Sequence, residues 1–226
     1  MAEIFDEWPE KYDRWFETPI GRLVKECESR LLGKMARPER GEKILDVGCG
    51  TGVFTADLLA AGSQVTGIEL SLPMLKRAGK KASVYPFDMV LGDMRRLPFA
   101  TGCFDKTVSV TAIEFLDEDA GDAVAEMFRV TRPGGLIVVA SLNSLSPWAA
   151  RRRIAATQGH PIFTHTRFRS PSEMADLAPL PVRVKTAVHF QKDDDPSRAV
   201  EIERDGDARG LDSGAFVAAC WEKPGA

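Results

Sequence analysis

Short apolar runs alternate with amphipathic stretches along most of the chain. Five of these runs predict buried strands: Lys43–Gly48, Gln64–Leu70, Met89–Leu91, Lys106–Thr111 and Leu136–Ala140. Between them, apolar positions at helical spacing predict three helices: Thr51–Ala60, Pro73–Lys81 and Asp119–Thr131. Because strands and helices alternate, the pattern predicts an α/β fold with right-handed crossovers, a mostly parallel sheet and helices on both faces.

The first 38 residues follow a different pattern, which is helical throughout. Thr18 followed by Pro19 is typical of the start of a helix, with an N-cap hydroxyl and proline in the first turn. Beyond it, Ile20, Val24 and Leu31 fall on one helical face. We therefore expect residues 1–38 to form a helical segment that packs one face on the rest of the protein.

The C-terminal part adds two strands and two interruptions. Val182–Phe190 and Ala215–Trp221 predict a closing antiparallel pair, joined by the charged segment Gln191–Ser213, which we expect to be an external loop. An insertion over residues 141–180 follows the fifth strand and contains a capping box, Ser170–Glu173, that predicts a short helix. No repeat or linker interrupts the chain, so we expect a single domain over residues 1–226.

Composition and charge narrow the class of protein. The chain has 226 residues, 28% of them charged, and a net charge of −3, so it has no large basic excess for binding nucleic acid. Its four cysteines are scattered without a C-x-x-C pair, and no metal site is predicted. No apolar stretch reaches the length of a membrane span and the N-terminus is acidic, so the prediction is a cytoplasmic protein. The oligomeric state is left open.

The most informative segment is Ile44–Gly52, where the first strand ends in a glycine-rich turn. Its glycines are spaced G-x-G-x-G, and Asp46 stands two residues before the first of them. Strand, glycine turn and helix together present backbone N–H groups to a ligand. The spacing differs from the G-x-G-x-x-G of dinucleotide-binding proteins. It resembles the first motif of the class I S-adenosylmethionine (SAM)-dependent methyltransferases.

Three acids follow three successive strands, at the sheet edge where open α/β folds bind ligands. Asp46 would face the positively charged sulfonium and amino group, Glu69 the two ribose hydroxyls, and Asp93 the exocyclic amine of adenine. Each acid also has a simpler interpretation, as a helix cap or a turn residue. The three together are hard to explain by turns and caps, and they indicate a nucleoside site.

The resemblance to this family continues along the chain. Leu97-Pro98-Phe99, Cys103-Phe104-Asp105 and the turn Arg129–Gly135 are similar to the type 11 subgroup, which includes ubiquinone- and menaquinone-biosynthesis methyltransferases. It covers residues 40–141 and implies a Rossmann-like seven-stranded sheet with an antiparallel last strand, an N-terminal helical lid and SAM as cofactor. It also implies these cofactor-binding residues: Asp46, Gly48, Cys49, Gly50, Gly52, Glu69, Leu70, Met74, Asp93, Met94, Thr111 and Tyr12.

Candidate residues for the acceptor side come from the N-terminal segment and the 141–180 insertion. Tyr12 shares one helical face with Trp15 and Phe16, either as part of an apolar lid or as an anchor to the core. His160 and His165 are candidate bases, although a histidine on a surface loop is the commoner case. Glu114, after the fourth strand, can orient the acceptor, contact SAM or simply start a helix.

Two charged runs complete the list of candidates. Arg151–Arg153 can attract an anionic acceptor, but we interpret the run as a solvated helix face. Asp193–Asp195 is likewise interpreted as solvated, because adjacent acids on a loop point in different directions.

These features predict SAM-dependent methyl transfer to a small-molecule acceptor by in-line displacement. The alternatives are a non-catalytic SAM-binding or scaffold protein and an NAD-dependent oxidoreductase. The glycine spacing and the poor placement of the two tyrosines, Tyr12 and Tyr85, disfavour the oxidoreductase.

Overall fold

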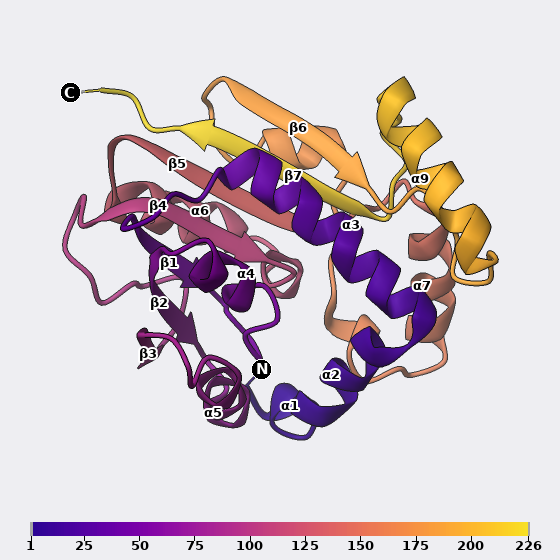
Figure 1. The fold of residues 1–226 in the computed structure, drawn as a ribbon, viewed down its shortest axis with the longest axis horizontal. Coiled ribbons are helices and arrows are strands. Elements are labelled where there is room, and N and C mark those ends of the chain that lie inside the picture. Colours follow the sequence, from indigo (N-terminus) through magenta and orange to yellow (C-terminus); the bar gives the residue numbers. More distant parts are fainter. Residues whose placement is uncertain (1, 226) are drawn as a thin grey trace.

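The computed structural model describes residues 2–225, so residues 1 and 226 of the predicted domain lie outside it. Its seven-stranded sheet has the order β3-β2-β1-β4-β5-β7-β6 (Figure 1). The strands are β1 (Lys43–Val47), β2 (Gln64–Glu69), β3 (Phe87–Leu91), β4 (Phe104–Val110), β5 (Thr131–Leu142), β6 (Val182–Ala187) and β7 (Phe216–Glu222). β1 to β5 pair in parallel, whereas β7 is antiparallel to both β5 and β6. The predicted sheet with an antiparallel last strand is confirmed.

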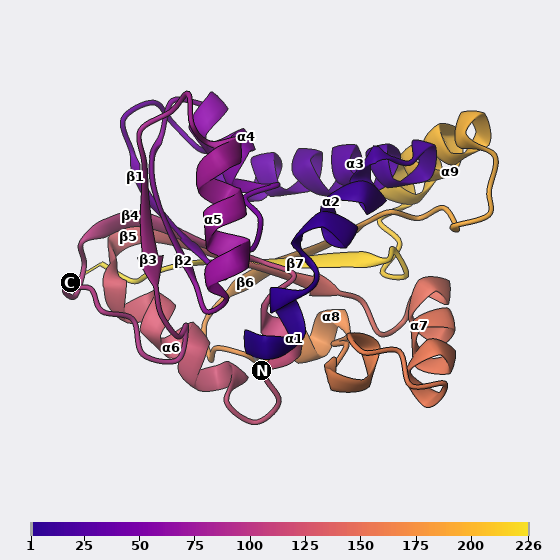
Figure 2. The same ribbon diagram turned by 90° about the horizontal axis from the view of Figure 1, so that it is seen from below.

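Helices cover both faces of the sheet (Figure 2). The N-terminal helices are α1 (Ala2–Asp6), α2 (Pro9–Glu17) and α3 (Pro19–Ala36). The others are α4 (Thr55–Ala60), α5 (Leu72–Lys81), α6 (Ala120–Val130), α7 (Pro147–Thr157), α8 (Pro171–Ala175) and α9 (Pro196–Arg209), with short 3-10 helices η1 (Ile113–Phe115) and η2 (Phe163–His165). α3, α4 and α5 lie on one face, and α6 and α8 on the other. Over the described residues, no helix has the length and apolar character needed to cross a membrane.

Alternation along each strand divides the core between these two faces. Ile44 packs in the cluster that includes Leu31 of α3, whereas its neighbour Leu45 packs in the cluster that includes Met127 of α6. Val138 and Ile137 on β5 divide in the same way. Because successive side chains of a strand point to opposite faces, both sides of the central strands are buried, as in other helix-covered parallel sheets.

The long helix α3 begins and ends as local chemistry requires. The Thr18 side chain accepts a hydrogen bond from the backbone N–H of Gly21, with Pro19 in the first turn, which confirms the predicted start. At the other end Arg37 is left-handed, with φ 45°. Val24 and Leu31 are buried on the face that the pattern predicted, and the helix lies across β5 and β7 (Figure 1).

The prediction that Gln191–Ser213 is an external loop is wrong, because most of it forms α9. Asp195 caps this helix by accepting from the N–H of Ser197, and Pro196 occupies the first turn. Two ion pairs join α9 to α3: Arg30–Glu203 at 3.3 Å and Lys34–Asp207 at 3.2 Å. The predicted strand Val182–Phe190 also ends early, at Ala187, because Val188 has a φ of 64° that leaves the extended conformation.

Candidate functional site

A cavity of about 670 Å³ opens at the carboxyl ends of β1, β2 and β4. It extends from the glycine loop after β1 to a second half enclosed by α2, α3 and α7. The three acids that the sequence singled out, Asp46, Glu69 and Asp93, all line it. The parallel sheet brings them together because their strands end at one edge.

Glu69 has the most fully organised carboxylate of the three. Its two oxygens accept from the backbone N–H groups of Gly50 at 3.0 Å, Leu70 at 2.9 Å and Ser71 at 2.9 Å. Burial raises the pKa of the Glu69 carboxyl, and these hydrogen bonds oppose the rise. A fixed acceptor of this kind at the end of β2 suits a pair of ribose hydroxyls.

Asp46 is buried, and among the described side chains the Thr55 hydroxyl donates a hydrogen bond to it at 2.6 Å. Burial raises the pKa of Asp46 to about 7, and the negative charge of Glu69 adds to the rise. A positively charged ligand in the cavity would stabilise the ionised form of Asp46.

Asp93 is in a different state from the other two acids. Arg95 binds its carboxylate through the side chain at 2.6 Å and through the backbone N–H at 2.9 Å, and Arg95 also reaches Asp119. The neighbouring guanidinium lowers the pKa of Asp93. The carboxylate is therefore held in an ionised, oriented form at the cavity wall.

The three motif glycines differ in what they do. Gly48 has φ 72°, and a Cβ there would lie 2.5 Å from the Cβ of Ala112, so the turn can pass the end of β4 only without a side chain. Gly50 has φ 54° and nothing within 4 Å of an added Cβ, which leaves open space on its cavity side. Gly52 does not line the cavity; its missing side chain makes room for Ala78 of α5.

The remaining residues proposed for cofactor binding lie in the same cavity: Tyr12, Cys49, Leu70, Met74, Met94 and Thr111. Thr111 has φ 49°, an uncommon conformation for a β-branched residue, and its hydroxyl lies 3.4 Å from that of Tyr12. Burial raises the pKa of Tyr12, so its phenol remains protonated. The contact joins α2 to the end of β4.

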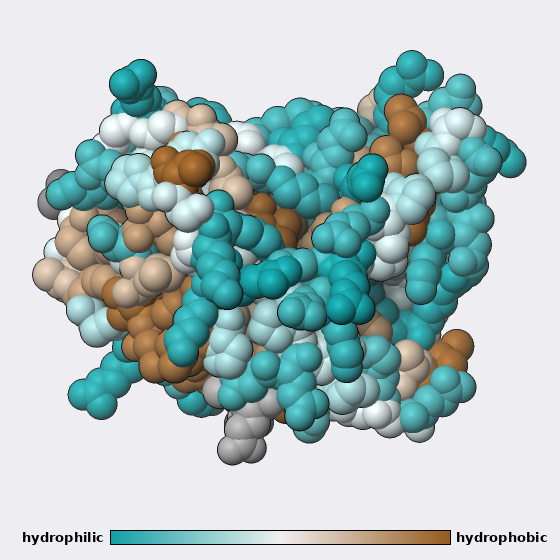
Figure 3. Space-filling model, turned by 60° about the horizontal axis from the view of Figure 1, so that its bottom comes forward, coloured by the Kyte–Doolittle hydropathy of each residue, from teal (hydrophilic) through white to brown (hydrophobic). Residues whose placement is uncertain are grey.

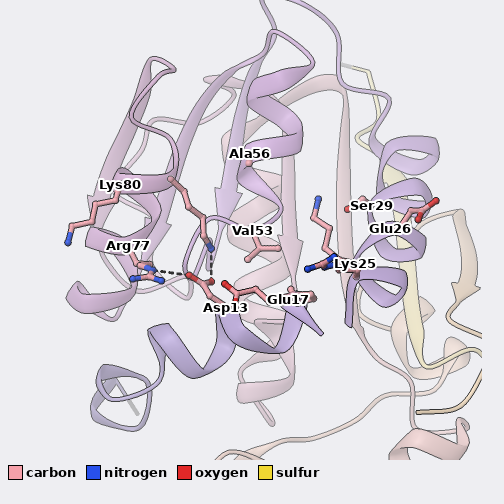
Figure 4. A pocket seen from close by; sticks show the side chains of 12 residues that line it. Asp13, Glu17, Lys25, Glu26, Ser29, Val53, Ala56, Arg77 and Lys80 are labelled. Carbon is pink, nitrogen blue, oxygen red and sulfur yellow. Dashed lines mark hydrogen bonds and ion pairs between the residues drawn. The ribbon is translucent and has the colours of Figure 1, made fainter. Parts of the chain in front are cut away.

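Asp13, beside Tyr12, fastens α2 over the cavity. Its buried carboxylate accepts from Thr51 of the glycine loop at 2.7 Å, from Arg77 at 2.8 Å and from Lys81 at 2.6 Å. Figure 4 shows Asp13 pointing from α2 toward Arg77, at the end of a second, charged groove on the outer side of the helix. The N-terminal segment is therefore latched to both α5 and the glycine loop.

Aromatic side chains dominate the acceptor half of the cavity. They come from segments far apart in the sequence: Phe5, Trp8, Trp15, Phe115, Trp148 and Phe163. Trp15 and Trp148 meet edge to face with ring centroids 6.2 Å apart, which closes α2 against α7. This half is suited to a flat or apolar molecule.

Three ionisable groups are set among these rings. Glu28 of α3 is 5% exposed and Glu114 of η1 is 2% exposed. Burial raises the pKa of Glu28 to about 8 and that of Glu114 to about 7. Glu114 accepts from Ser141 at 3.2 Å, whereas Glu28 has no hydrogen-bond partner among the described residues. Arg152 of α7 faces both, and burial lowers its pKa only to about 10, so it stays charged at neutral pH.

The two candidate histidines occupy different places. The His160 ring lines the cavity and stacks on Phe163 at 4.3 Å, and its Nδ1 accepts from the backbone N–H of Ile162 at 3.3 Å. This arrangement makes Nε2 the protonated nitrogen of the neutral ring, and hence a donor. His165 is exposed and is not part of the cavity wall.

Comparison with known proteins agrees with this geometry. The methyltransferase-domain family matches residues 45–139. A demethylmenaquinone methyltransferase of Beutenbergia cavernae is 38% identical over 155 residues, which are 66% of this chain and 60% of that protein. An uncharacterized methyltransferase of Geobacillus kaustophilus is 36% identical over 157 residues, 68% of this chain and 72% of that protein.

The chain belongs to the class I SAM-dependent methyltransferases. A malonyl-[acyl-carrier protein] O-methyltransferase of Pectobacterium atrosepticum is 35% identical over 70% of this chain and 60% of that protein. The chain thus spans about 60% of the length of this relative and of the Beutenbergia enzyme. A solved methyltransferase of Thermotoga maritima has the same fold, with a TM-score of 0.77, 22% identity and coverage of 99% and 100% of the two chains.

SAM, the cofactor of this methyltransferase family, fits the residues present. Open space beside Gly50 would admit the methionine part close to the backbone. The buried acid Asp46 would face its positive charge, and the fixed carboxylate of Glu69 would accept from the ribose hydroxyls. Each requirement is met by a group that this structure already orients.

Sequence reasoning missed Glu28 and misjudged Arg152. Glu28 lies four residues after Val24 and three before Leu31, so a carboxyl on the apolar face of the predicted helix was an available signal. The prediction that the Arg151–Arg153 run is a solvated face is wrong for Arg152, which lines the cavity. It holds for the exposed Arg153, whereas Arg151 is exposed but also borders the cavity, where it pairs with Asp193.

Proposed function

We propose that this protein transfers a methyl group from SAM to a small-molecule acceptor. The observation that carries the proposal is one cavity joining two unlike halves. The strand-tip acids Asp46, Glu69 and Asp93 line one half, and the aromatic chamber under α2 and α7 forms the other. A cofactor in the first half would direct its reactive end toward an acceptor in the second.

Bound SAM supplies a methyl group already activated by its sulfonium centre. The protein therefore contributes mainly proximity, alignment and a water-poor environment. Glu69 accepts hydrogen bonds from the ribose hydroxyls, Asp93 accepts from the adenine amine, and Asp46 balances the positive charge. The latch of Asp13 keeps α2 over the two reactants.

Glu114 is our first candidate for orienting or deprotonating the acceptor. It is buried at the end of β4, lines the acceptor half, and has a pKa near neutrality. His160 is assigned a hydrogen-bond donor role, since its Nδ1 is already an acceptor. His165 remains a sequence-based candidate only, because it is exposed and does not line the cavity.

Several features of the proposal rest on the sequence alone. The single-domain organisation over residues 1–226, a cytoplasmic location and the lack of a nucleic-acid partner stay predictions. Demethylmenaquinone and malonyl-[acyl-carrier protein], after which two of the relatives are named, are substrates of those proteins. For this chain we propose only that the acceptor is small enough for the aromatic half of the cavity.

Calorimetry with SAM and S-adenosylhomocysteine tests the cofactor half. We expect Glu69→Ala to weaken the binding of both ligands about tenfold or more. The substitution removes the acceptor for the ribose hydroxyls and leaves three backbone N–H groups without their partner. Glu201→Ala, at an exposed position of α9, is the control and should bind like the wild type. If the wild type binds neither ligand, the proposed function is wrong.

Incubation with methyl-labelled SAM and a cell extract, followed by mass spectrometry, tests the transfer itself. We expect labelled small molecules that are absent when Glu69→Ala replaces the wild type. Tight binding of SAM without label in any product would instead support the non-catalytic alternative.

A further inference from the structure

The cations of the cavity show which kind of acceptor it is built to hold. Five basic side chains line the cavity: Lys11, Arg95, Arg151, Arg152 and Lys192. Two of them are neutralised, because Arg95 pairs with Asp93 and Asp119, and Arg151 pairs with Asp193. The other three form no ion pair with any side chain that the structure describes.

Each of these three unpaired cations lies over the face of a cavity tryptophan. Lys11 is 5.0 Å from the ring centroid of Trp8, Arg152 is 5.3 Å from that of Trp148, and Lys192 is 5.7 Å from that of Trp15. A tryptophan face attracts and positions a cation without cancelling its charge. The arrangement therefore holds three positive charges in place around an aromatic chamber.

The three cations come from separate parts of the fold. Lys11 belongs to α2, Arg152 to α7, and Lys192 to the segment between β6 and α9. Lys11 and Lys192 are exposed at the rim, whereas Arg152 reaches inward, where its Nη1 is buried without a hydrogen-bond partner among the described residues. A buried guanidinium nitrogen without a partner is costly, and a bound acceptor oxygen would remove that cost.

The nearby carboxyls do not take the role of that missing partner. Glu28 and Glu114 face Arg152, yet neither forms an ion pair with it. Glu28 also faces Lys25, and both carboxyls face the phenol of Tyr12. Burial raises the pKa of both acids, so each is less ionised than an exposed carboxyl and neutralises less of the charge of Arg152.

We propose that the methyl acceptor is a small organic carboxylate with an apolar or aromatic body. This inference rests on the proposed function and names the substrate class for its acceptor site. Arg152 binds the carboxylate, the tryptophan-lined chamber receives the body, and Lys11 and Lys192 attract the anion at the rim. A planar carboxylate matches the planar guanidinium better than a spherical anion does.

Three probes with one phenylpropyl skeleton test the charge preference: 3-phenylpropionate, 3-phenylpropanol and 3-phenylpropylamine. Their affinities are measured by calorimetry on the full chain saturated with S-adenosylhomocysteine. We expect the carboxylate to bind about tenfold or more tighter than the alcohol, as a charge-assisted hydrogen bond provides, and the amine to bind most weakly. Equal affinities, a preference for the amine, or no binding by any probe would overturn the inference.

Arg152→Gln identifies the residue responsible. It should reduce the affinity for 3-phenylpropionate about tenfold and leave 3-phenylpropanol unchanged, because only the anion uses the charge. Arg153→Gln is the matched control, since Arg153 is exposed and donates only to the carbonyl of Ser144. Loss of carboxylate binding in the control alone would contradict the assignment.

S-adenosylhomocysteine binding, measured on the same samples, separates this inference from the proposed function. If the wild type does not bind S-adenosylhomocysteine, the proposed function itself fails. If it binds but the carboxylate has no advantage, only the inference fails. Should Arg152→Gln not fold, Arg152→Lys retains the charge and is expected to keep a preference for the carboxylate over the alcohol.

Discussion

The three acids of the cofactor half show how strongly local surroundings set the state of one chemical group. Asp46 is buried with a single hydroxyl partner, so its pKa rises to about 7. Asp93 is bound by Arg95, so its pKa falls below its ordinary value. Glu69 is held by backbone N–H groups that need no side chain of their own. One site thus combines a carboxyl whose pKa is near 7 with two carboxylates that hydrogen bonds already hold in place.

Gly48→Ala tests the close approach of the glycine loop to β4. An added Cβ would lie 2.5 Å from that of Ala112 at a φ of 72°, so we expect unfolding to require about 2 kcal/mol less free energy. Urea denaturation measures this loss. Gly33→Ala in α3 is the control, since its Cβ meets nothing within 4 Å. The control should be as stable as the wild type, or up to about 1 kcal/mol more stable. Equal stability of both variants would contradict this account.

At the scale of elements, α2 lies over the cavity and is joined to neighbouring parts of the fold by side-chain contacts. Asp13 joins it to the glycine loop and to α5, the Tyr12–Thr111 contact joins it to β4, and Trp15 packs on Trp148 of α7. Loops and lids of this kind come from the less stable parts of a protein, because a ligand must pass beneath them.

Asp13→Ala should release this lid. The variant loses the ion pairs with Arg77 and Lys81 and the hydrogen bond from Thr51, so we expect about tenfold weaker binding of S-adenosylhomocysteine. Limited proteolysis should also cut the N-terminal segment faster than in the wild type. Glu10→Ala on the same helix is the control, because its ion pair with Arg14 is exposed. Identical digestion of the two variants would show that Asp13 is not a latch.

The helix α9 shows where the pattern of residues was too weak to predict an element. Only Ala199, Glu203 and Gly206 of its 14 residues are buried, so it has no continuous apolar stripe. Its position depends on ion pairs to α3 and on close contact with His189, which a Cβ at Gly206 would approach to 2.3 Å. Such partners are distant in the sequence and leave no periodic signal.

At the scale of the whole molecule, the buried acids make stability depend on pH. Burial raises the pKa of Glu28 to about 8, and those of Glu114 and Asp46 to about 7. A carboxyl whose pKa is higher in the folded state stabilises the protein fully at low pH. That contribution is lost as the pH rises through the folded-state pKa. The free energy of unfolding should therefore fall between about pH 5 and pH 9.

Urea denaturation at a series of pH values measures this slope. Glu28→Gln keeps a neutral side chain of similar size, so it should flatten the fall, most clearly between about pH 7 and pH 9. Glu201→Gln, exposed on α9, should keep the wild-type slope. A Glu28→Gln profile parallel to that of the wild type would mean that Glu28 is ionised throughout.

The sequence by itself determined the five parallel strands with the helices α4, α5 and α6 between them, the buried face of α3, and the glycine loop with its three acids. These are local properties, because periodicity, caps and turns act over a few residues. The tertiary structure alone decided that Glu28, Arg152 and the tryptophans Trp8, Trp15 and Trp148 share one chamber. It also decided that most of the charged segment Gln191–Ser213 forms the helix α9. Periodicity reports that a face is buried, but the identity of the partner depends on how distant segments pack.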